Sequence, residues 1–87
     1  IDVFFNSTNN QFTRQTIASV TSNATHLEVG DIDRDGDLDV LANFTSGVAW
    51  FENTGSTFVR RSISTSYVYS IDTADLDLDG DLDIIYA

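Results

Sequence analysis

Two acidic nonapeptides, nearly identical and 44 positions apart, dominate this sequence. Residues 31–39 read DIDRDGDLD and residues 75–83 read DLDLDGDLD, so that seven of the nine positions agree. A second correspondence runs at an offset of 46, where Phe5, Thr8, Phe12, Arg14 and Ile17 recur as Phe51, Thr54, Phe58, Arg60 and Ile63. The two-residue difference falls between Val20 and Thr25, in a predicted linker where insertions are tolerated. A period of about 40–50 residues is typical of β-propellers and solenoids.

The repeated unit is predicted to consist of strands. β-branched and aromatic residues dominate its apolar runs, Gly, Asn and Ser separate these runs, and no stretch has a convincing helical period. The expected strands of the complete unit, joined by short turns into a four-stranded antiparallel meander, are 27–30, 38–44, 48–52 and 58–63. The same pattern predicts strands at 1–5 and 12–18 before this unit and at 68–74 and 82–86 after it.

The phase of the repeat predicts an all-β propeller segment, 1–87, with one whole blade and two half blades. Residues 1–19 form the second half of a blade, residues 26–64 a complete blade, and residues 67–87 the first half of another. Each half blade ends in a bare strand edge. Neighbours such as Trp50 and Phe51 point to opposite faces of a strand, so both faces of the sheet are apolar. We therefore expect completion by other copies of the chain, as a homo-oligomer, or by the remainder of a longer propeller chain.

The acidic loops have the residue pattern of calcium sites. Carboxylates at positions 1, 3 and 5 of a tight loop converge, the glycine at position 6 permits the turn, and position 7 offers its carbonyl. An all-oxygen set without histidine or cysteine suits calcium rather than zinc. The predicted ligands of the first site are the carboxylates of Asp31, Asp33, Asp35 and Asp39 and the carbonyl of Asp37. Those of the second site are the carboxylates of Asp75, Asp77, Asp79 and Asp83 and the carbonyl of Asp81.

Two other interpretations of the loops are less favoured. An EF-hand has a glutamate at loop position 12, where Ala42 and Tyr86 stand, and it has flanking helices where strands are predicted here. A merely solvated turn needs one or two aspartates, whereas five within nine residues repel one another. We therefore expect about two Ca²⁺ ions per chain, with a structural role that lets each hairpin close.

At this spacing, and between predicted strands, the two loops resemble the FG-GAP/VCBS repeats of integrin-α-like β-propellers. The segment Asn53-Thr-Gly-Ser-Thr-Phe58 is similar to the turn after the third strand of VCBS-type repeats. The resemblance covers essentially the whole chain and implies calcium ligation at 31–39 and 75–83 in a ring of six to eight blades. Three or four copies joined head to tail would give six or eight blades. Neither Phe-Gly nor Gly-Ala-Pro occurs, which favours the bacterial VCBS-like branch over integrin-type ligand recognition.

Composition restricts the partners. The net charge of −10 argues against binding to nucleic acid and to anionic membranes, and the apolar runs are too short for membrane insertion. Ten of the twelve aspartates lie in the two acidic windows, so the rest of the chain is close to neutral. The absence of cysteine excludes disulfides. The absence of methionine, even at position 1, predicts a processed piece or an excised fragment.

Aromatic residues outside the loops have two interpretations each. Trp50 suits a sugar-stacking platform, but packing in the core is favoured because Phe4 occupies the matching position at the offset of 46. Tyr67 and Tyr69 alternate with Val68 and so point one way, either to contact a glycan or to pack at the rim or channel.

Polar residues give little support to catalysis. Glu28 and Asp72 occupy equivalent positions on predicted innermost strands, where they would form a carboxylate pair for glycoside hydrolysis or simply line the channel. His26 is the only histidine and has no partner motif. We therefore predict that the chain is not an enzyme.

These features predict a calcium-binding β-propeller module that acts as a binding or adhesion scaffold outside the cell, secreted or at the cell surface and bacterial. The alternatives are a carbohydrate-binding, lectin-like propeller, and the non-catalytic part of a polysaccharide-active enzyme. The expected ligand is a glycan or a protein.

Overall fold

The structure, a computed structural model, describes residues 1–19 and 23–87, and this part of the chain contains eight strands and no helix. The strands form three antiparallel sheets of two, four and two strands. Their bounds are β1 Asp2–Asn6, β2 Phe12–Thr16, β3 Ala24–Gly30, β4 Asp39–Phe44, β5 Gly47–Asn53, β6 Phe58–Ser64, β7 Ile71–Ala74 and β8 Asp83–Tyr86. The all-β prediction with blade-like antiparallel meanders is thus confirmed.

The central sheet has the order β3-β4-β5-β6 and is the predicted four-stranded meander. Its first strand begins at Ala24 instead of Leu27, because Ala24 still pairs with Phe44 across an irregularity in the ladder. The predicted linker from Val20 to Thr25 lies partly outside the described residues, and its last two residues belong to β3. Every residue of β4 is buried, so this strand is the centre of the molecule.

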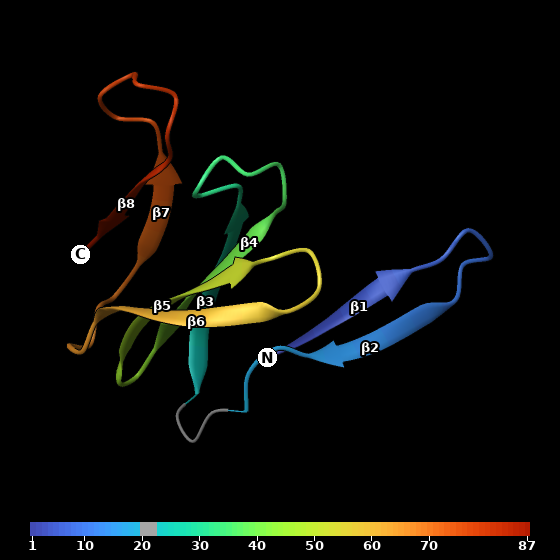
Figure 1. Cartoon of the computed structure of the whole chain (residues 1–87). Helices are drawn as coiled ribbons and strands as arrows, with labels where there is room; N and C mark the ends of the chain where they lie inside the picture. The colour runs from blue at the N-terminus through green and yellow to red at the C-terminus, as the bar shows by residue number, and fades with distance from the viewer. Residues whose placement is uncertain (20–22) are drawn as a thin grey trace.

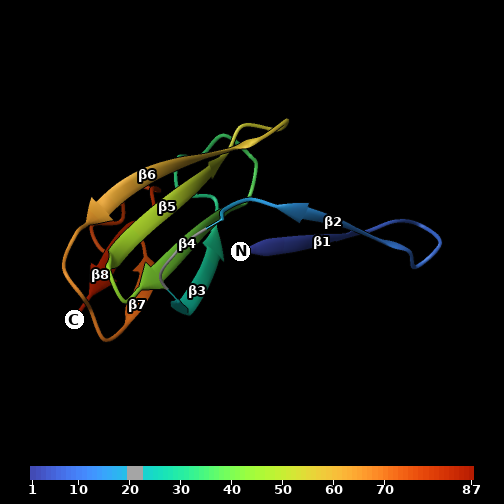
Figure 2. The same cartoon turned by 90° about the horizontal axis from the view of Figure 1, so that it is seen from below.

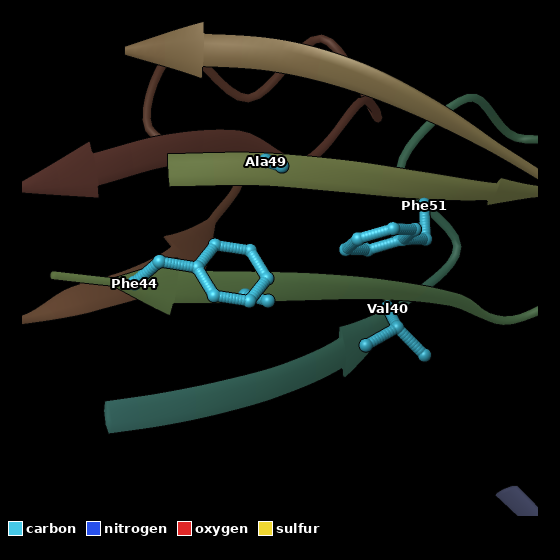
Figure 3. Close-up of a cluster of buried hydrophobic side chains, with 5 residues drawn as sticks. Val40, Phe44, Ala49 and Phe51 are labelled. Carbon is cyan, nitrogen blue, oxygen red and sulfur yellow. The ribbon is translucent and has the colours of Figure 1, made fainter. Parts of the chain in front are cut away.

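Alternation along β4 and β5 supplies apolar side chains to both faces of the central sheet. One face carries Val40, Ala42, Phe44, Ala49 and Phe51, all buried. Figure 3 shows the rings of Phe44 and Phe51 on this face, where they pack edge to face with centroids 6.3 Å apart. The opposite face carries Leu41 and Val48, which pack with Val68 and Ile71.

The two hairpins lie on opposite sides of this sheet. Ile1, Ile17 and Ala18, at the base of the β1–β2 hairpin, pack on the face with Phe44 and Phe51. Residues around the β7–β8 hairpin pack on the other face, and β7 contacts β3. The central sheet therefore lies between them, as Figure 1 shows.

The β1–β2 hairpin projects away from the rest of the molecule beyond its base (Figure 2). Phe4, Phe5 and Phe12 are 57%, 47% and 62% exposed. The radius of gyration of 13.6 Å exceeds the roughly 12 Å expected of a compact domain of this length. Both expected apolar faces are therefore buried along β4 and β5 of the central sheet, but the first hairpin leaves its own aromatic side chains in water.

The pairing registers correct one detail of the repeat. Phe4 pairs with Arg14, and Phe51 pairs with Arg60. Phe4 therefore takes the place of Phe51, and the prediction that Phe4 matches Trp50 is wrong. The cause is the turn, which holds five residues between Asn6 and Phe12 but four between Asn53 and Phe58. The extra turn residue shifts β1 to an offset of 47, while β2 keeps the offset of 46.

Candidate metal-binding loops

The two acidic loops have the same backbone shape. The first joins β3 to β4 and the second joins β7 to β8, at corresponding ends of their strands. Gly36 and Gly80 both have φ 93°, and Arg34 and Leu78 have φ 60° and 61°. Positive φ is uncommon outside glycine. It recurs at the same two positions in both loops, although one of these positions holds Arg34 in the first loop and Leu78 in the second. The turn is therefore specified by the shared acidic pattern and not by the side chain at this variable position.

Main-chain N–H groups of the first loop donate to its own carboxylates. Asp31 accepts from Asp35 at 3.1 Å and from Gly36 at 2.9 Å. Asp33 accepts from the N–H of Asp35 at 3.3 Å, and Asp35 accepts from that of Asp37 at 2.8 Å. These bonds fold the loop back on its first residue and bring the carboxylates inward.

The second loop repeats the pattern. Asp75 accepts from Asp79 at 3.1 Å and from Gly80 at 2.8 Å. Asp77 accepts from Asp79 at 3.2 Å, and Asp79 accepts from Asp81 at 2.8 Å. The two loops are therefore equivalent in their internal hydrogen bonds.

Three carboxylates converge in each loop, from the first, third and ninth loop positions. In each group, one ligand oxygen per residue lies within 4.8 Å of the others; the groups are Asp31, Asp33 and Asp39, and Asp75, Asp77 and Asp83. Three hard oxygen ligands around one point suit a calcium ion, which takes further ligands from carbonyls and water.

The remaining four predicted ligands lie elsewhere in the loops. The carboxylates of Asp35 and Asp79, at position 5, are outside the converging groups and instead accept the N–H two residues on. Asp37 and Asp81 are predicted to bind the ion through their main-chain carbonyls. Their carboxylates likewise lie outside the converging groups. Position 5 thus supports the loop backbone in this structure.

The carboxylate of Asp33 lies close to other carboxylates of the first loop. Partial removal from water, followed by the negative charges of Asp35 and Asp39, raises the pKa of Asp33 to about 6. The side chain of Glu52 adds to the same rise in the pKa of Asp33. A cation between these carboxylates would relieve the repulsion, so the donor set and its electrostatics fit a divalent metal.

Asp39 and Asp83 close the two sites in different surroundings. Asp39 is fully buried and accepts the N–H of Ile32 at 2.9 Å and the N–H of Asn53 at 2.8 Å. Asp83 is half-buried and accepts the N–H of Leu76 at 2.8 Å. The difference is Asn53, which ends β5 beside the first loop.

Asn53 and Arg34 contact the loops although neither was among the predicted site residues. Asn53 also donates from Nδ2 to the carbonyl of Leu38 at 3.1 Å, so the turn after β5 is tied to the first loop. Its place could have been inferred, because the third strand of a meander ends beside the loop between the first two. Arg34 Nε lies 3.5 Å from Asp81 Oδ1 and links the two loops. No sequence pattern indicated that contact.

The aromatic candidates are placed as follows. Trp50 is half-buried against the cluster containing Leu41, which agrees with packing, and the guanidinium of Arg61 lies 5.6 Å from its ring. Tyr67 and Tyr69 contact each other edge to face with centroids 5.3 Å apart, and Tyr69 is 84% exposed.

The polar candidates form local contacts. His26 Nε2 and Glu28 Oε1 lie 2.7 Å apart on β3. Asp72 accepts the N–H of the adjacent Thr73 at 2.8 Å. Both carboxylates therefore have hydrogen-bond partners next to them in the chain.

The comparison with protein families gave a match in the first half of the chain. Residues 1–42 match a family model described as an FG-GAP-like repeat. The matched segment includes the first acidic loop, and the second loop has the same geometry outside it. No curated protein and no solved structure gave a significant match. No helix in the described residues is long and apolar enough to cross a membrane.

Proposed function

Residues 1–42 carry an FG-GAP-like repeat, and from this repeat and the two loops we propose that the chain is a calcium-stabilised β-propeller module. Each loop binds one Ca²⁺ through its three converging carboxylates. The convergence of these groups, at the same positions in both loops, carries the proposal. FG-GAP repeats commonly bind calcium, which supports it further.

The role of the ions in this proposal is structural. Each loop joins two paired strands, and its carboxylates repel one another when no cation is present. An ion that binds the folded loop and not the unfolded chain stabilises the fold by mass action. The module then works as a rigid, non-catalytic scaffold outside the cell, the setting that is typical of FG-GAP repeats.

Calorimetric titration of chelator-stripped protein with Ca²⁺ tests the metal sites. We expect two ions per chain in the unaltered protein and one ion in each of Asp33→Ala and Asp77→Ala. Asp72→Asn is the matched control, since it removes a negative charge outside the loops and should still bind two. Unchanged stoichiometry in both loop variants would contradict the assignment.

The tyrosine pair favours a glycan as the bound ligand over a protein. Tyr67 and Tyr69 present an exposed aromatic surface between β6 and β7, and aromatic faces suit stacking on sugar rings. A glycan array on the unaltered protein and on Tyr69→Ala tests this. Signals that Tyr69→Ala abolishes would support a lectin-like module, while signals unchanged by the substitution, or none, would argue against it.

A further inference from the structure

Two of the free strand edges in the described part of the chain, those of β1 and β8, belong to strands whose counterparts β5 and β4 are paired on both sides. There β1 pairs only with β2, and β8 pairs only with β7. Apolar side chains flank both edges: Phe4 on β1 is 57% exposed, and Ile85 and Tyr86 on β8 are 41% and 50% exposed. Bare edges of this kind are templates for pairing with another strand.

The central sheet shows what such a pairing would look like. The register of β7 with β8 is that of β3 with β4 moved by 44 residues, as Asp72 opposite Ile85 and Glu28 opposite Leu41 illustrate. β1 and β2 reproduce β5 and β6, with Asn6 opposite Phe12 as Asn53 is opposite Phe58.

We propose that the β1–β2 hairpin of a second copy of this chain pairs with β8 and places its Asn6 at the second acidic loop. The resulting sheet, β7-β8-β1-β2, is a second complete blade built from two chains. This inference deepens the proposed function, on which it rests, because it makes the second metal site a shared one.

The register of this joint follows from the pairing of β4 with β5. Val40 lies opposite Phe51, and Leu41 lies opposite Trp50. Transferred to the joint, this places Ile84 opposite Phe4 of the second copy. It likewise places Ile85 opposite Val3, so that apolar residues meet on both faces.

The second acidic loop lacks the contact that the joint would supply. The main-chain N–H of Asn53 donates to Asp39, and its Nδ2 donates to the carbonyl of Leu38. Asn6 occupies the position of Asn53 in the hairpin. From a second copy, Asn6 would donate in the same way to Asp83 and to the carbonyl of Leu82.

The geometry favours a second copy over the same chain as the occupant. The two hairpins lie on opposite sides of the central sheet, so β1 of one chain is separated from its own β8 by that sheet (Figure 1). Each copy offers one hairpin and one open β8 edge. Such head-to-tail contacts either close into a ring or continue as a fibre. With two blades per copy, a closed ring has an even number of blades.

Engineered cysteines test the register, since the chain has no cysteine of its own. Val3→Cys combined with Ile85→Cys puts two thiols directly opposite each other across the joint, within reach of a disulfide. On oxidation we expect covalent oligomers on a non-reducing gel. Val3→Cys with Ile84→Cys is the matched control, because residues 84 and 85 point to opposite faces and the cross-link should drop to background.

Sedimentation of the unaltered, calcium-loaded protein gives the independent measurement. Closed oligomers of three or four copies are expected, and a folded monomer at all concentrations would overturn the proposal. So would equal cross-linking of the two cysteine pairs, which would show contact without this register. If the cysteine variants fail to fold, the sedimentation result alone decides.

Asn6→Ala tests the shared site. It should lower the calcium affinity of one of the two sites several-fold, and Asn53→Ala should lower that of the other. Two unaltered sites in Asn6→Ala would contradict the role of Asn6. If the unaltered protein binds no calcium but the cross-link forms, the proposed function and the shared metal site are both wrong and only the pairing of β8 with β1 stands. If a monomer binds two ions normally, only this inference is wrong.

Discussion

The first acidic loop and the second form the same internal hydrogen bonds in different surroundings. In both, the carboxylate at position 1 accepts two main-chain N–H groups and the carboxylate at position 9 accepts the N–H at position 2. Yet Asp39 is fully buried, while Asp83 is only half-buried. The loop shape is therefore local, whereas burial of its last carboxylate depends on a neighbouring third strand.

The same contrast separates the complete blade from the half blades. Phe51 on β5 is 1% exposed, and its counterpart Phe4 on β1 is 57% exposed. Both are aromatic, and both face an arginine across the ladder. What differs is the set of neighbours, because β5 lies between two strands and β1 has one. The phenylalanine at this repeat position is therefore buried where its strand has a neighbour on both sides and exposed where it has only one.

The largest expected effect compares these two phenylalanines. Phe51→Ala should lower the free energy of unfolding by about 3–5 kcal/mol, because it empties a packed site in the core. In a single chain Phe4→Ala should cost less than about 1 kcal/mol, since the ring is already in water. Urea denaturation at several protein concentrations measures both. A loss in Phe4→Ala that grows with concentration would show that β1 becomes buried on assembly, and equal losses at high dilution would refute the contrast.

The next effect compares the two closing carboxylates without calcium. Asp39→Asn should destabilise the fold by about 1–3 kcal/mol. The two carboxylate oxygens of Asp39 accept the N–H groups of Ile32 and Asn53, and Asn would replace one of these acceptors with an NH₂ donor. Asp83→Asn should cost less, since its carboxylate is half-buried and accepts one N–H. Both variants relieve loop repulsion to a similar degree, so the difference isolates the Asn53 contact. Denaturation in chelator measures it, and equal losses would mean that this contact adds nothing.

Much of the fold could be predicted from the sequence because the repeat is strict. Alternating apolar residues and short polar turns located all eight strands, and the duplicated DxDxDGxxD pattern located both loops. Boundaries were less certain: β7 begins at Ile71 although its apolar run begins at Val68, which is buried in the preceding segment. The register of β1 was misjudged because one extra residue in a polar turn leaves no mark on the strand pattern.

The candidate site was less predictable than the fold. Sequence spacing indicates which aspartates share a loop, but not that the carboxylate of Asp35 turns back to its own backbone. Asn53 and Arg34 reach the loops from the next turn and from the neighbouring loop. The place of Asn53 follows from the meander, but the contact of Arg34 depends on how one sheet packs beside another, which a single sequence does not specify.

A smaller effect tests whether the loop shape is local. Gly36→Ala and Gly80→Ala should each cost about 1–2 kcal/mol, because both glycines have φ 93° and a Cβ is strained there. Near Gly36 an added Cβ meets no atom within 4 Å, and near Gly80 it meets only the flexible end of Arg34, 3.0 Å away. Thermal unfolding of the two variants provides the comparison. A much larger loss in one of them would show that its surroundings, and not the loop itself, impose the turn.

The smallest effect concerns the contact between the two loops. Arg34→Leu gives the first loop the residue that the second has at Leu78, and it removes the contact of 3.5 Å with Asp81. Both partners are more than half exposed, so the loss should be about 0.2–1 kcal/mol at low salt and should vanish in high salt. Urea denaturation at two NaCl concentrations measures it. Leu78→Arg is the control, because it adds the same charge at the corresponding position of the second loop. If Leu78→Arg stabilises the protein only in the oligomer, a loop of a second copy lies beside Leu78. If the loss of stability in Arg34→Leu does not depend on salt, the arginine acts through packing instead of charge.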